Sequence, residues 1–269
     1  MKKTLFILAL ACSALQFTSC SKSSSTPAPT VAWTATVAMS AKFEVPAVAG
    51  RNETATAELQ ILSDNTLKYA ITVNNLTAGD ALSAAHIHLG NAGVSGPVYI
   101  PFNGTLSGST VTGTVQLTAG QADTIKTMES YVNVHTTQAG GGLVRGQVDS
   151  KVVYAADIVM NGANEVPAVT TTATGVAIVR MTENKKLYVK VSVSNLEAGD
   201  AMTFAHFHSG TSTVSGPVIL GFYSAAADFG TLKTVTVDNT FYASLLADPL
   251  YVNAHSTLRG SGIVRGQIR

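Results

Sequence analysis

The sequence predicts an all-β protein made of two tandem domains, each a β-sandwich or a barrel-like sheet. Three observations support this prediction. A histidine-bearing pattern occurs twice, with equivalent positions 120 residues apart, as at Tyr131 and Tyr251. Short segments alternate apolar and polar residues, which is typical of half-buried strands, and turns of Gly, Asn, Asp and Pro separate them. The regular alternation of strands and helices that a parallel sheet requires does not occur in either repeat.

The chain begins with a predicted secretory signal. Two lysines precede an apolar core at residues 5–15, which is too short to span a bilayer as a permanent helix. The segment ends at Cys20 and resembles a bacterial lipoprotein signal, because a small residue precedes the cysteine and a Ser- and Pro-rich stretch follows it. We therefore expect a lipoprotein signal peptide at 1–19, lipidation of Cys20 and a flexible tether at 20–31. The alternative is an ordinary signal peptide with Cys20 as a stray thiol.

Composition narrows the compartment and the partners. The only cysteines are Cys12, inside the predicted signal, and Cys20. Once processed, the chain has no thiol for a disulfide, a thiolate metal site or cysteine catalysis. The 17 basic and 16 acidic side chains form no basic patch, which argues against nucleic acid as a partner. We expect a lipid-anchored protein of a bacterial cell envelope, in the outer membrane, with an unidentified extracytoplasmic protein or glycan as its ligand.

The two repeats place domain 1 at residues 32–150 and domain 2 at 151–269. Their similarity extends beyond histidine, because both contain a Glu-Val-Pro and an Asn-Leu-x-Ala-Gly-Asp sequence. The alternation of apolar and polar residues predicts strands, and two segments without it are the candidates for helical turns. The predicted strands include 54–61, 67–73 and 187–193, and the predicted helical turns are 118–128 and 239–247.

All six histidines occupy equivalent positions of the two repeats. Each repeat has an Ala-His-x-His sequence, a Tyr-x-Asn-x-His sequence and a closing Arg-Gly-Gln. Because side chains on a strand alternate between faces, the polar members of these three segments share the face opposite to their apolar neighbours. We expect this non-core face to be partly covered by the Gly-rich segments 90–97 and 210–217. The polar set comprises His86, His88, Asn133, His135, Arg145 and Gln147 in the first repeat, and His206, His208, Asn253, His255, Arg265 and Gln267 in the second.

These motifs together resemble the chordin-type, or CHRD, domain family. The family pattern has a Glu-x-Pro entry, an Ala-His-x-His-x-Gly centre, a Gly-Pro, a Tyr-x-Asn-x-His segment and a final Arg-Gly-Gln, and both repeats contain every element. The resemblance implies immunoglobulin-like or Greek-key β-sandwich domains with a barrel-like shape. It also implies secretion or lipid anchoring, but no defined biochemical activity.

A weaker resemblance links the histidines to the copper site of Cu/Zn superoxide dismutases. His-x-His on a strand, a remote histidine and an arginine are similar, but each repeat has three histidines where that copper site has four. A zinc set and the disulfide cysteines of those enzymes are also missing from the sequence.

Three hypotheses about the histidines follow from the sequence. Three imidazoles on neighbouring strands suit copper or zinc with one open position. Alternatively, the histidines belong to a hydrogen-bonded polar network that ties the strands together without metal. A third hypothesis is a copper-dependent, dismutase-like enzyme in which Arg145 and Arg265 steer an anion.

The sequence favours a non-catalytic binding module over an enzyme. It contains no Ser/His/Asp order and no Gly-rich phosphate loop, so no catalytic residue is assigned. Glu44 and Glu165 are single carboxylates, whereas a glycosidase requires a pair, and we expect them to accept turn or inter-strand hydrogen bonds. Asp80 and Asp200 follow glycine in turns, where local hydrogen bonds to the backbone are the ordinary role of aspartate.

Overall fold

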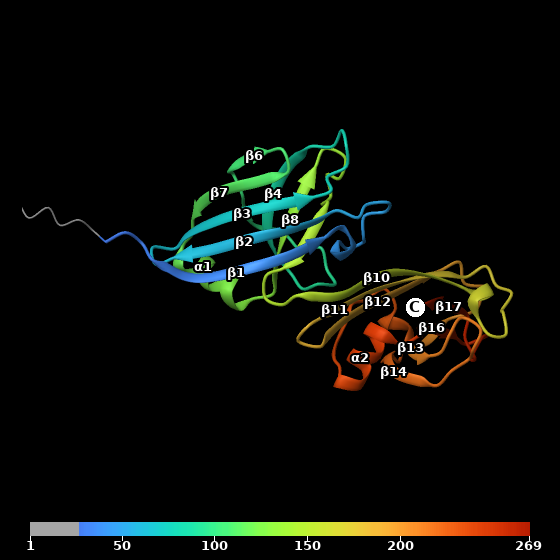
Figure 1. Cartoon of the computed structure of the whole chain (residues 1–269). Coiled ribbons are helices and arrows are strands. Elements are labelled where there is room, and N and C mark those ends of the chain that lie inside the picture. Colours follow the sequence, from blue (N-terminus) through green and yellow to red (C-terminus); the bar gives the residue numbers. More distant parts are fainter. Residues whose placement is uncertain (1–26) are drawn as a thin grey trace, which may run out of the picture.

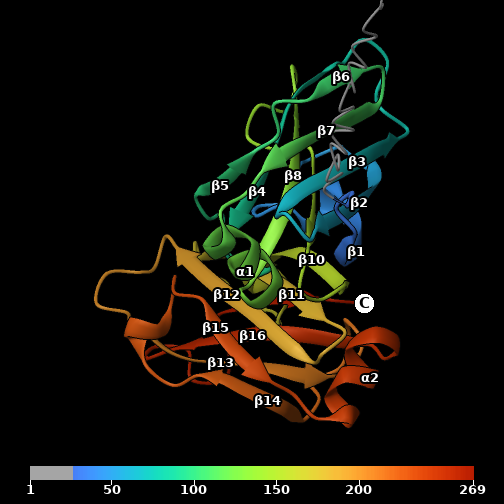
Figure 2. The same cartoon turned by 90° about the vertical axis from the view of Figure 1, so that its left-hand side faces the viewer.

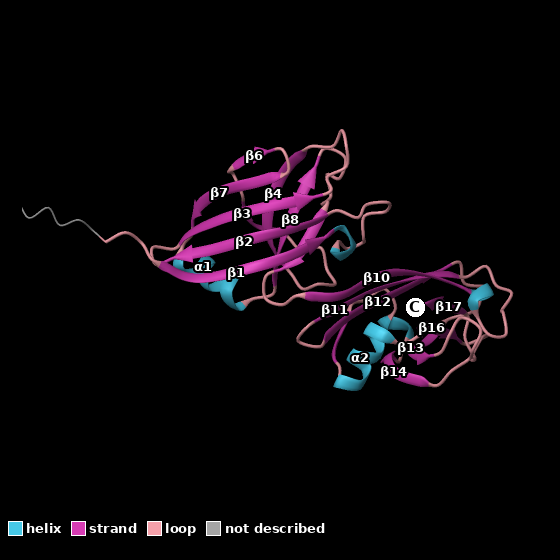
Figure 3. Ribbon diagram, viewed as in Figure 1, coloured by secondary structure: helices cyan, strands magenta, loops and turns pink. Residues whose placement is uncertain are grey.

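Each repeat forms one antiparallel β-sheet that curls back toward itself (Figures 1 and 3). The computed structural model describes residues 27–269, and the prediction of two tandem all-β domains is confirmed. The predicted signal peptide, Cys20 and most of the tether lie outside the described residues. The first strand begins at Val31, the last residue of the predicted tether. No helix in the described part of the chain is long and apolar enough to cross a membrane.

The sheet of the first domain has nine strands in the order β5-β4-β8-β9-β1-β2-β3-β7-β6. Strand β6, at one end of this order, contacts β4 near the other end, so the sheet is barrel-like rather than two separate layers. The elements are β1 (Val31–Ser40), β2 (Thr54–Leu62), β3 (Thr66–Asn74), β4 (Leu82–Leu89), β5 (Val98–Pro101), β6 (Thr105–Ser107), β7 (Thr110–Gln116), α1 (Ala119–Thr127), β8 (Ser130–Thr136) and β9 (Val144–Gln147), with a 3₁₀ turn η1 (Ala41–Phe43).

The second domain repeats this arrangement with eight strands in the order β14-β13-β16-β17-β10-β11-β12-β15. The two edges of this sheet also lie close together. The Tyr223 hydroxyl at the end of β14 accepts a hydrogen bond from the Val191 amide of β12 at 3.1 Å. The elements are β10 (Val152–Asn161), β11 (Thr174–Thr182), β12 (Lys186–Ser194), β13 (Met202–Ser209), β14 (Val218–Tyr223), β15 (Lys233–Thr236), α2 (Asn239–Ala247), β16 (Leu250–Ser256) and β17 (Val264–Gln267), with 3₁₀ turns η2 (Gly162–Asn164) and η3 (Ala226–Asp228).

The predicted alternation of faces builds one apolar core inside each sheet. Along β2 and β3 every second side chain is buried, and on β4 and β8 residues such as Ile87, Val132 and Val134 complete the core. Both predicted helices form. Helix α1 begins at a capping box between Thr118 and Gln121, which satisfies backbone amides that a helix start leaves without partners. The core therefore fixes the outward orientation of the alternate residues on β4 and β8.

The two domains pack against each other through the outer face of β10–β12 (Figure 2). Lys186 Nζ and the Tyr188 hydroxyl both donate to the Glu129 carboxylate, at 2.9 and 2.7 Å. The Ala47 amide donates to the Asp157 carboxylate at 2.8 Å. A small apolar cluster that includes Ala92, Val152 and Tyr188 fills the space between these polar contacts.

Candidate metal centres

The three histidines of the first domain meet at the outer face of β4 and β8. These strands are antiparallel neighbours, and a register shift places Ala84 opposite His135, so that His86, His88 and His135 converge. One ring nitrogen from each lies within 4.8 Å of the others. The closest pair is His86 Nδ1 and His135 Nε2, which are 3.2 Å apart.

Backbone carbonyls fix the tautomers of two of these rings. His88 Nδ1 lies 2.9 Å from the Gly96 carbonyl oxygen and His135 Nδ1 lies 3.0 Å from that of Gly140. A carbonyl can only accept, so each Nδ1 carries the proton and each Nε2 presents a lone pair. The Nε2 atom of His88 is buried and has no hydrogen-bond partner. This orientation by a second hydrogen bond is what metal-binding histidines commonly have.

The second domain reproduces the same geometry. His206 Nδ1 and His255 Nε2 are 3.2 Å apart. His208 Nδ1 donates to the Gly216 carbonyl and His255 Nδ1 donates to the Gly260 carbonyl, both at 3.0 Å. His208 Nε2 is again buried without a partner. Two independent copies of one arrangement show that it is a built feature of the fold.

Burial favours the neutral, metal-binding form of five of these imidazoles. It lowers the pKa of His86 and His88 below the usual value, and the neighbouring histidines lower it further. Burial likewise lowers the pKa of His206, His208 and His255. Neutral imidazole is the ligand form, so little proton release is needed for binding near pH 7.

Two of the three nitrogens already have the spacing that a tetrahedral ion requires, and the His88 ring would move toward them on binding. Zn–N bonds of 2.0–2.1 Å place two ligand nitrogens about 3.3 Å apart. The 3.2 Å between His86 and His135 meets this directly. Three histidines then leave one coordination position for water or an external ligand. The His86–His135 hydrogen bond would give way to two metal bonds.

The matches to protein families follow the same division of the chain. The model of the CHRD domain family matches residues 35–148 and again residues 157–268. The chain belongs to the CHRD domain family. No curated protein and no solved structure matches it. Each CHRD domain holds one complete histidine triad, and within residues 27–269 these two triads are the only groups of three or more His, Cys, Asp or Glu close enough to share an ion.

A tyrosine outside the predicted polar set organises each triad. In the first CHRD domain the Tyr131 ring stacks on His88, with centroids 4.8 Å apart and planes 9° apart. Its hydroxyl accepts a hydrogen bond from the Gly96 amide at 2.9 Å. Position 96 must be glycine, because a Cβ there would lie 1.7 Å from the Leu89 carbonyl oxygen. Tyr251, His208 and Gly216 repeat the arrangement, with ring centroids 4.7 Å apart. Tyr131 and His135 are four residues apart on β8 and so share one face of the strand. This shared face is the sequence signal from which the role of Tyr131 could have been predicted.

The remaining polar residues form a second cluster, which is separate from the triad by its hydrogen bonds. Asn133, Arg145 and Gln147 are nearly inaccessible to solvent, with exposures of 4, 1 and 5%. Segment 90–97 covers them: Arg145 Nη2 and Nη1 donate to the Asn91 and Val94 carbonyls, at 2.5 and 2.6 Å. Gln147 donates to the Gly90 carbonyl at 3.1 Å. None of these donors bonds to a histidine nitrogen, so the set that the sequence placed on one face divides into two.

Glu44 belongs to this second cluster of the first CHRD domain. Its buried carboxylate accepts a hydrogen bond from Asn133 Nδ2 at 3.3 Å, which is a contact between segments distant in sequence. Burial raises the pKa of Glu44 to about 7, against the opposing effects of Arg145 and Asn133. Burial also lowers the pKa of Arg145 to about 10.

The second CHRD domain has the same cluster around Glu165. Asn253 Nδ2 lies 2.8 and 2.7 Å from the two Glu165 carboxylate oxygens, and burial raises the pKa of Glu165 to about 7. Arg265 Nη2 donates to the Thr211 carbonyl at 2.6 Å, and Gln267 donates to the Gly210 carbonyl at 3.0 Å.

Asp80 has a wider role than the local turn predicted for it. It accepts the local bond from the Ala81 amide, but it also accepts bonds from Arg51 at 2.6 Å and from Thr136 at 2.8 Å. These bonds tie the turn before β4 to the end of β8, next to His135. Asp80 therefore holds together the two strands that carry the triad.

Proposed function

We propose that this CHRD-domain protein is a non-catalytic binding module whose two histidine triads each bind a copper or zinc ion. The observation that carries the proposal is the buried Nε2 of His88, and its counterpart in His208, which has no hydrogen-bond partner. A buried polar atom without a partner is costly in a protein interior. A metal ion shared with His86 and His135 would satisfy it. The alternative network hypothesis leaves this nitrogen unsatisfied.

The donor set limits the ions that the triads would hold. Three neutral imidazoles favour copper or zinc over magnesium or calcium, which prefer oxygen ligands. Cu(II) should bind more tightly than Zn(II), as nitrogen sites generally order these ions. The open position would allow the ion to contact water or an external ligand. Metal capture or metal-dependent attachment to a partner both fit this chemistry.

The expected result of titrating the metal-free full chain with Zn(II) or Cu(II) is two bound ions per chain. In isothermal titration calorimetry, the His86→Ala, His206→Ala double variant should lose both high-affinity events, because each triad keeps only two imidazoles. A Gln60→Ala variant, altered on an exposed strand position, should bind like the parent. Binding that survives the double variant unchanged would contradict the three-histidine sites.

We further propose that lipid on Cys20 holds the protein at a bacterial cell envelope, in the outer membrane, where it meets an extracytoplasmic protein or glycan. The support is the order of a short apolar core, the cysteine and a Ser- and Pro-rich stretch in the sequence. Replacement of Cys20 by serine should move the protein from the membrane fraction to the soluble fraction of the producing cells. Retention of the Cys20→Ser variant in the membrane fraction would refute the anchor.

A further inference from the structure

One loop of the first domain connects its triad to the second domain. This loop, residues 90–97, is called the covering loop here. Its Gly96 carbonyl accepts the His88 hydrogen bond that fixes the ring, and its Asn91 carbonyl accepts from Arg145. The same loop places Ala92, 2% exposed, in the apolar cluster between the domains. Gly96, which orients His88, therefore lies in the same short loop as the interdomain contact.

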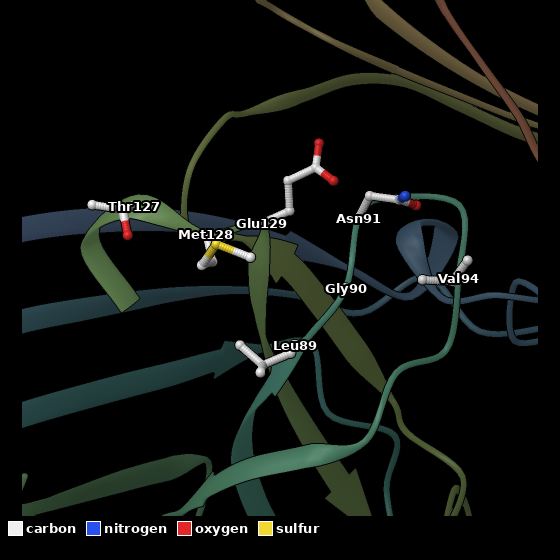
Figure 4. Close-up of a pocket in the computed structure, with 7 residues that line it drawn as sticks. All are labelled: Leu89, Gly90, Asn91, Val94, Thr127, Met128 and Glu129. Carbon is white, nitrogen blue, oxygen red and sulfur yellow. The ribbon is translucent and has the colours of Figure 1, made fainter. Parts of the chain in front are cut away.

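The contact of the covering loop with the second domain is close. A Cβ on Gly93 would lie 2.6 Å from Leu232 Cδ1 and 2.9 Å from Tyr188 Cβ, so the loop backbone rests directly on those side chains. The Gly90 amide donates to the Glu129 carbonyl at 2.9 Å, and the Glu129 carboxylate is held by Lys186 and Tyr188. Gly90, Asn91 and Glu129 line one pocket, whose volume is about 450 Å³. Figure 4 shows how these residues lie.

The equivalent loop of the second domain, residues 210–217, lacks this support. Residues 211–215 are all exposed, whereas 91–94 are buried or half-buried. Arg265 donates to one loop carbonyl, that of Thr211, where Arg145 donates to two. Position 213, equivalent to Gly93, is threonine. Thr213 is exposed, so its side chain has room that a side chain at position 93 would not have.

We propose that docking of the second domain onto the covering loop preorganises the first triad, so that the first triad binds its metal ion about tenfold more tightly than the second. The inference rests on the proposed metal-binding function. A ligand orientation that is already populated costs less to adopt on binding, and outer contacts that orient metal-binding histidines commonly contribute 10–100-fold in affinity. The histidine hydrogen bonds of the two triads match, and two differences remain: the interdomain contact of the first triad, and Phe204, which stacks on His206 in the second.

The coupling must also act in the reverse direction, because linkage between two equilibria is reciprocal. Metal bound at the first triad should strengthen the contact between the covering loop and β10–β12. Metal bound at the second triad should leave that contact unchanged, since residues 211–215 of the equivalent loop are exposed.

The test compares two full-length chains that each keep one triad. The His206→Ala, His208→Ala variant keeps the first triad, and the His86→Ala, His88→Ala variant keeps the second. Zn(II) affinity is measured by competition with a chromophoric chelator. We expect the first triad to bind about tenfold more tightly. Gly93→Thr, which copies Thr213 of the second domain, is then added to each of the two chains. It should lower the Zn(II) affinity of the first triad to that of the second, and it should leave the affinity of the second triad unchanged.

A second interface variant guards against local damage to the covering loop. Tyr188→Lys copies the residue at the equivalent position 68 and lies in the other domain, so it should weaken the first triad similarly. Val159→Thr, on an exposed part of β10, is the matched control and should change neither triad. Hydrogen exchange of residues 152–156 checks that the interface has opened in the two variants, and should slow on Zn(II) binding to the first triad only.

The outcomes separate this inference from the proposed function. If neither single-triad chain binds Zn(II), the metal-binding function itself is wrong. If both bind, but Gly93→Thr and Tyr188→Lys open the interface without weakening the first triad, the metal-binding function stands and the coupling is refuted.

Discussion

Replacing Arg145 with alanine should lower the free energy of unfolding of the first domain by about 3–5 kcal/mol, which is the usual cost of removing one partner from a buried charged cluster. Its guanidinium carbon lies 3.5 Å from the centroid of the Tyr131 ring, and its nitrogens bind two carbonyls of loop 90–97. The truncation would leave both carbonyls without this donor, and it would remove the positive charge that lowers the pKa of the buried Glu44 carboxyl. Native-state hydrogen exchange of β8 and β9 measures the loss by domain.

The second domain supplies a matched comparison for this prediction. Arg265 contacts the Tyr251 ring at 3.4 Å but donates to a single loop carbonyl, so Arg265→Ala should cost less than Arg145→Ala. Lys126→Ala removes a charge whose partner is mostly exposed, and should change stability by less than about 0.5 kcal/mol. A loss below about 1 kcal/mol for Arg145→Ala would contradict the role assigned to the buried cluster.

Replacing Glu44 with glutamine should stabilise the protein at pH 8 by about 3 kcal/mol and change little at pH 5. Burial raises the pKa of Glu44 from 4.5 to about 7 in the folded protein. Between these values the unfolded chain has released a proton that the folded protein retains. A rise in pH through this window therefore favours unfolding. Glu165→Gln should act in the same direction, because the pKa of Glu165 is also raised to about 7.

The comparison with the parent at each pH isolates this effect. The histidines act in the opposite direction, since burial lowers the pKa of His86 and His88 and a rise in pH toward 6.5 favours the folded state. They are common to parent and variant and cancel in the difference. Urea unfolding at pH 5 and pH 8 gives that difference, and Glu58→Gln on exposed β2 is the control. An equal effect of Glu44→Gln at both pH values would show that Glu44 ionises as it does in the unfolded chain.

Strand alternation explains why much of the fold and the triads could be predicted from sequence. His86 and His88 are two residues apart on a strand whose other residues are apolar, so burial of Ile87 and its neighbours fixes the histidine face. The third histidine, His135, follows from the same rule once β8 is placed beside β4. The duplication of the pattern adds the identical set in the second domain.

Long-range contacts explain why other parts of the site could not be predicted. Glu44 reaches Asn133 across 89 positions of sequence, and no local pattern announces that pairing. The interdomain contact depends on Arg180 and Tyr188, where the first repeat has Gln60 and Lys68. Arg180 is fully buried and donates to the Glu44 carbonyl oxygen at 2.5 Å. The replacement of Gln60 and Lys68 by Arg180 and Tyr188 can be interpreted only once the packing of the two domains is known.

The most direct test of the metal sites is anomalous X-ray diffraction at the zinc edge from crystals grown with Zn(II). We predict two strong peaks per chain, each about 2.0–2.1 Å from one ring nitrogen of every histidine in a triad. The nitrogens of the first triad are His86 Nδ1, His88 Nε2 and His135 Nε2, and those of the second are His206 Nδ1, His208 Nε2 and His255 Nε2. Crystals that bind zinc elsewhere, with both triads empty and the His86–His135 hydrogen bond intact, would contradict the account.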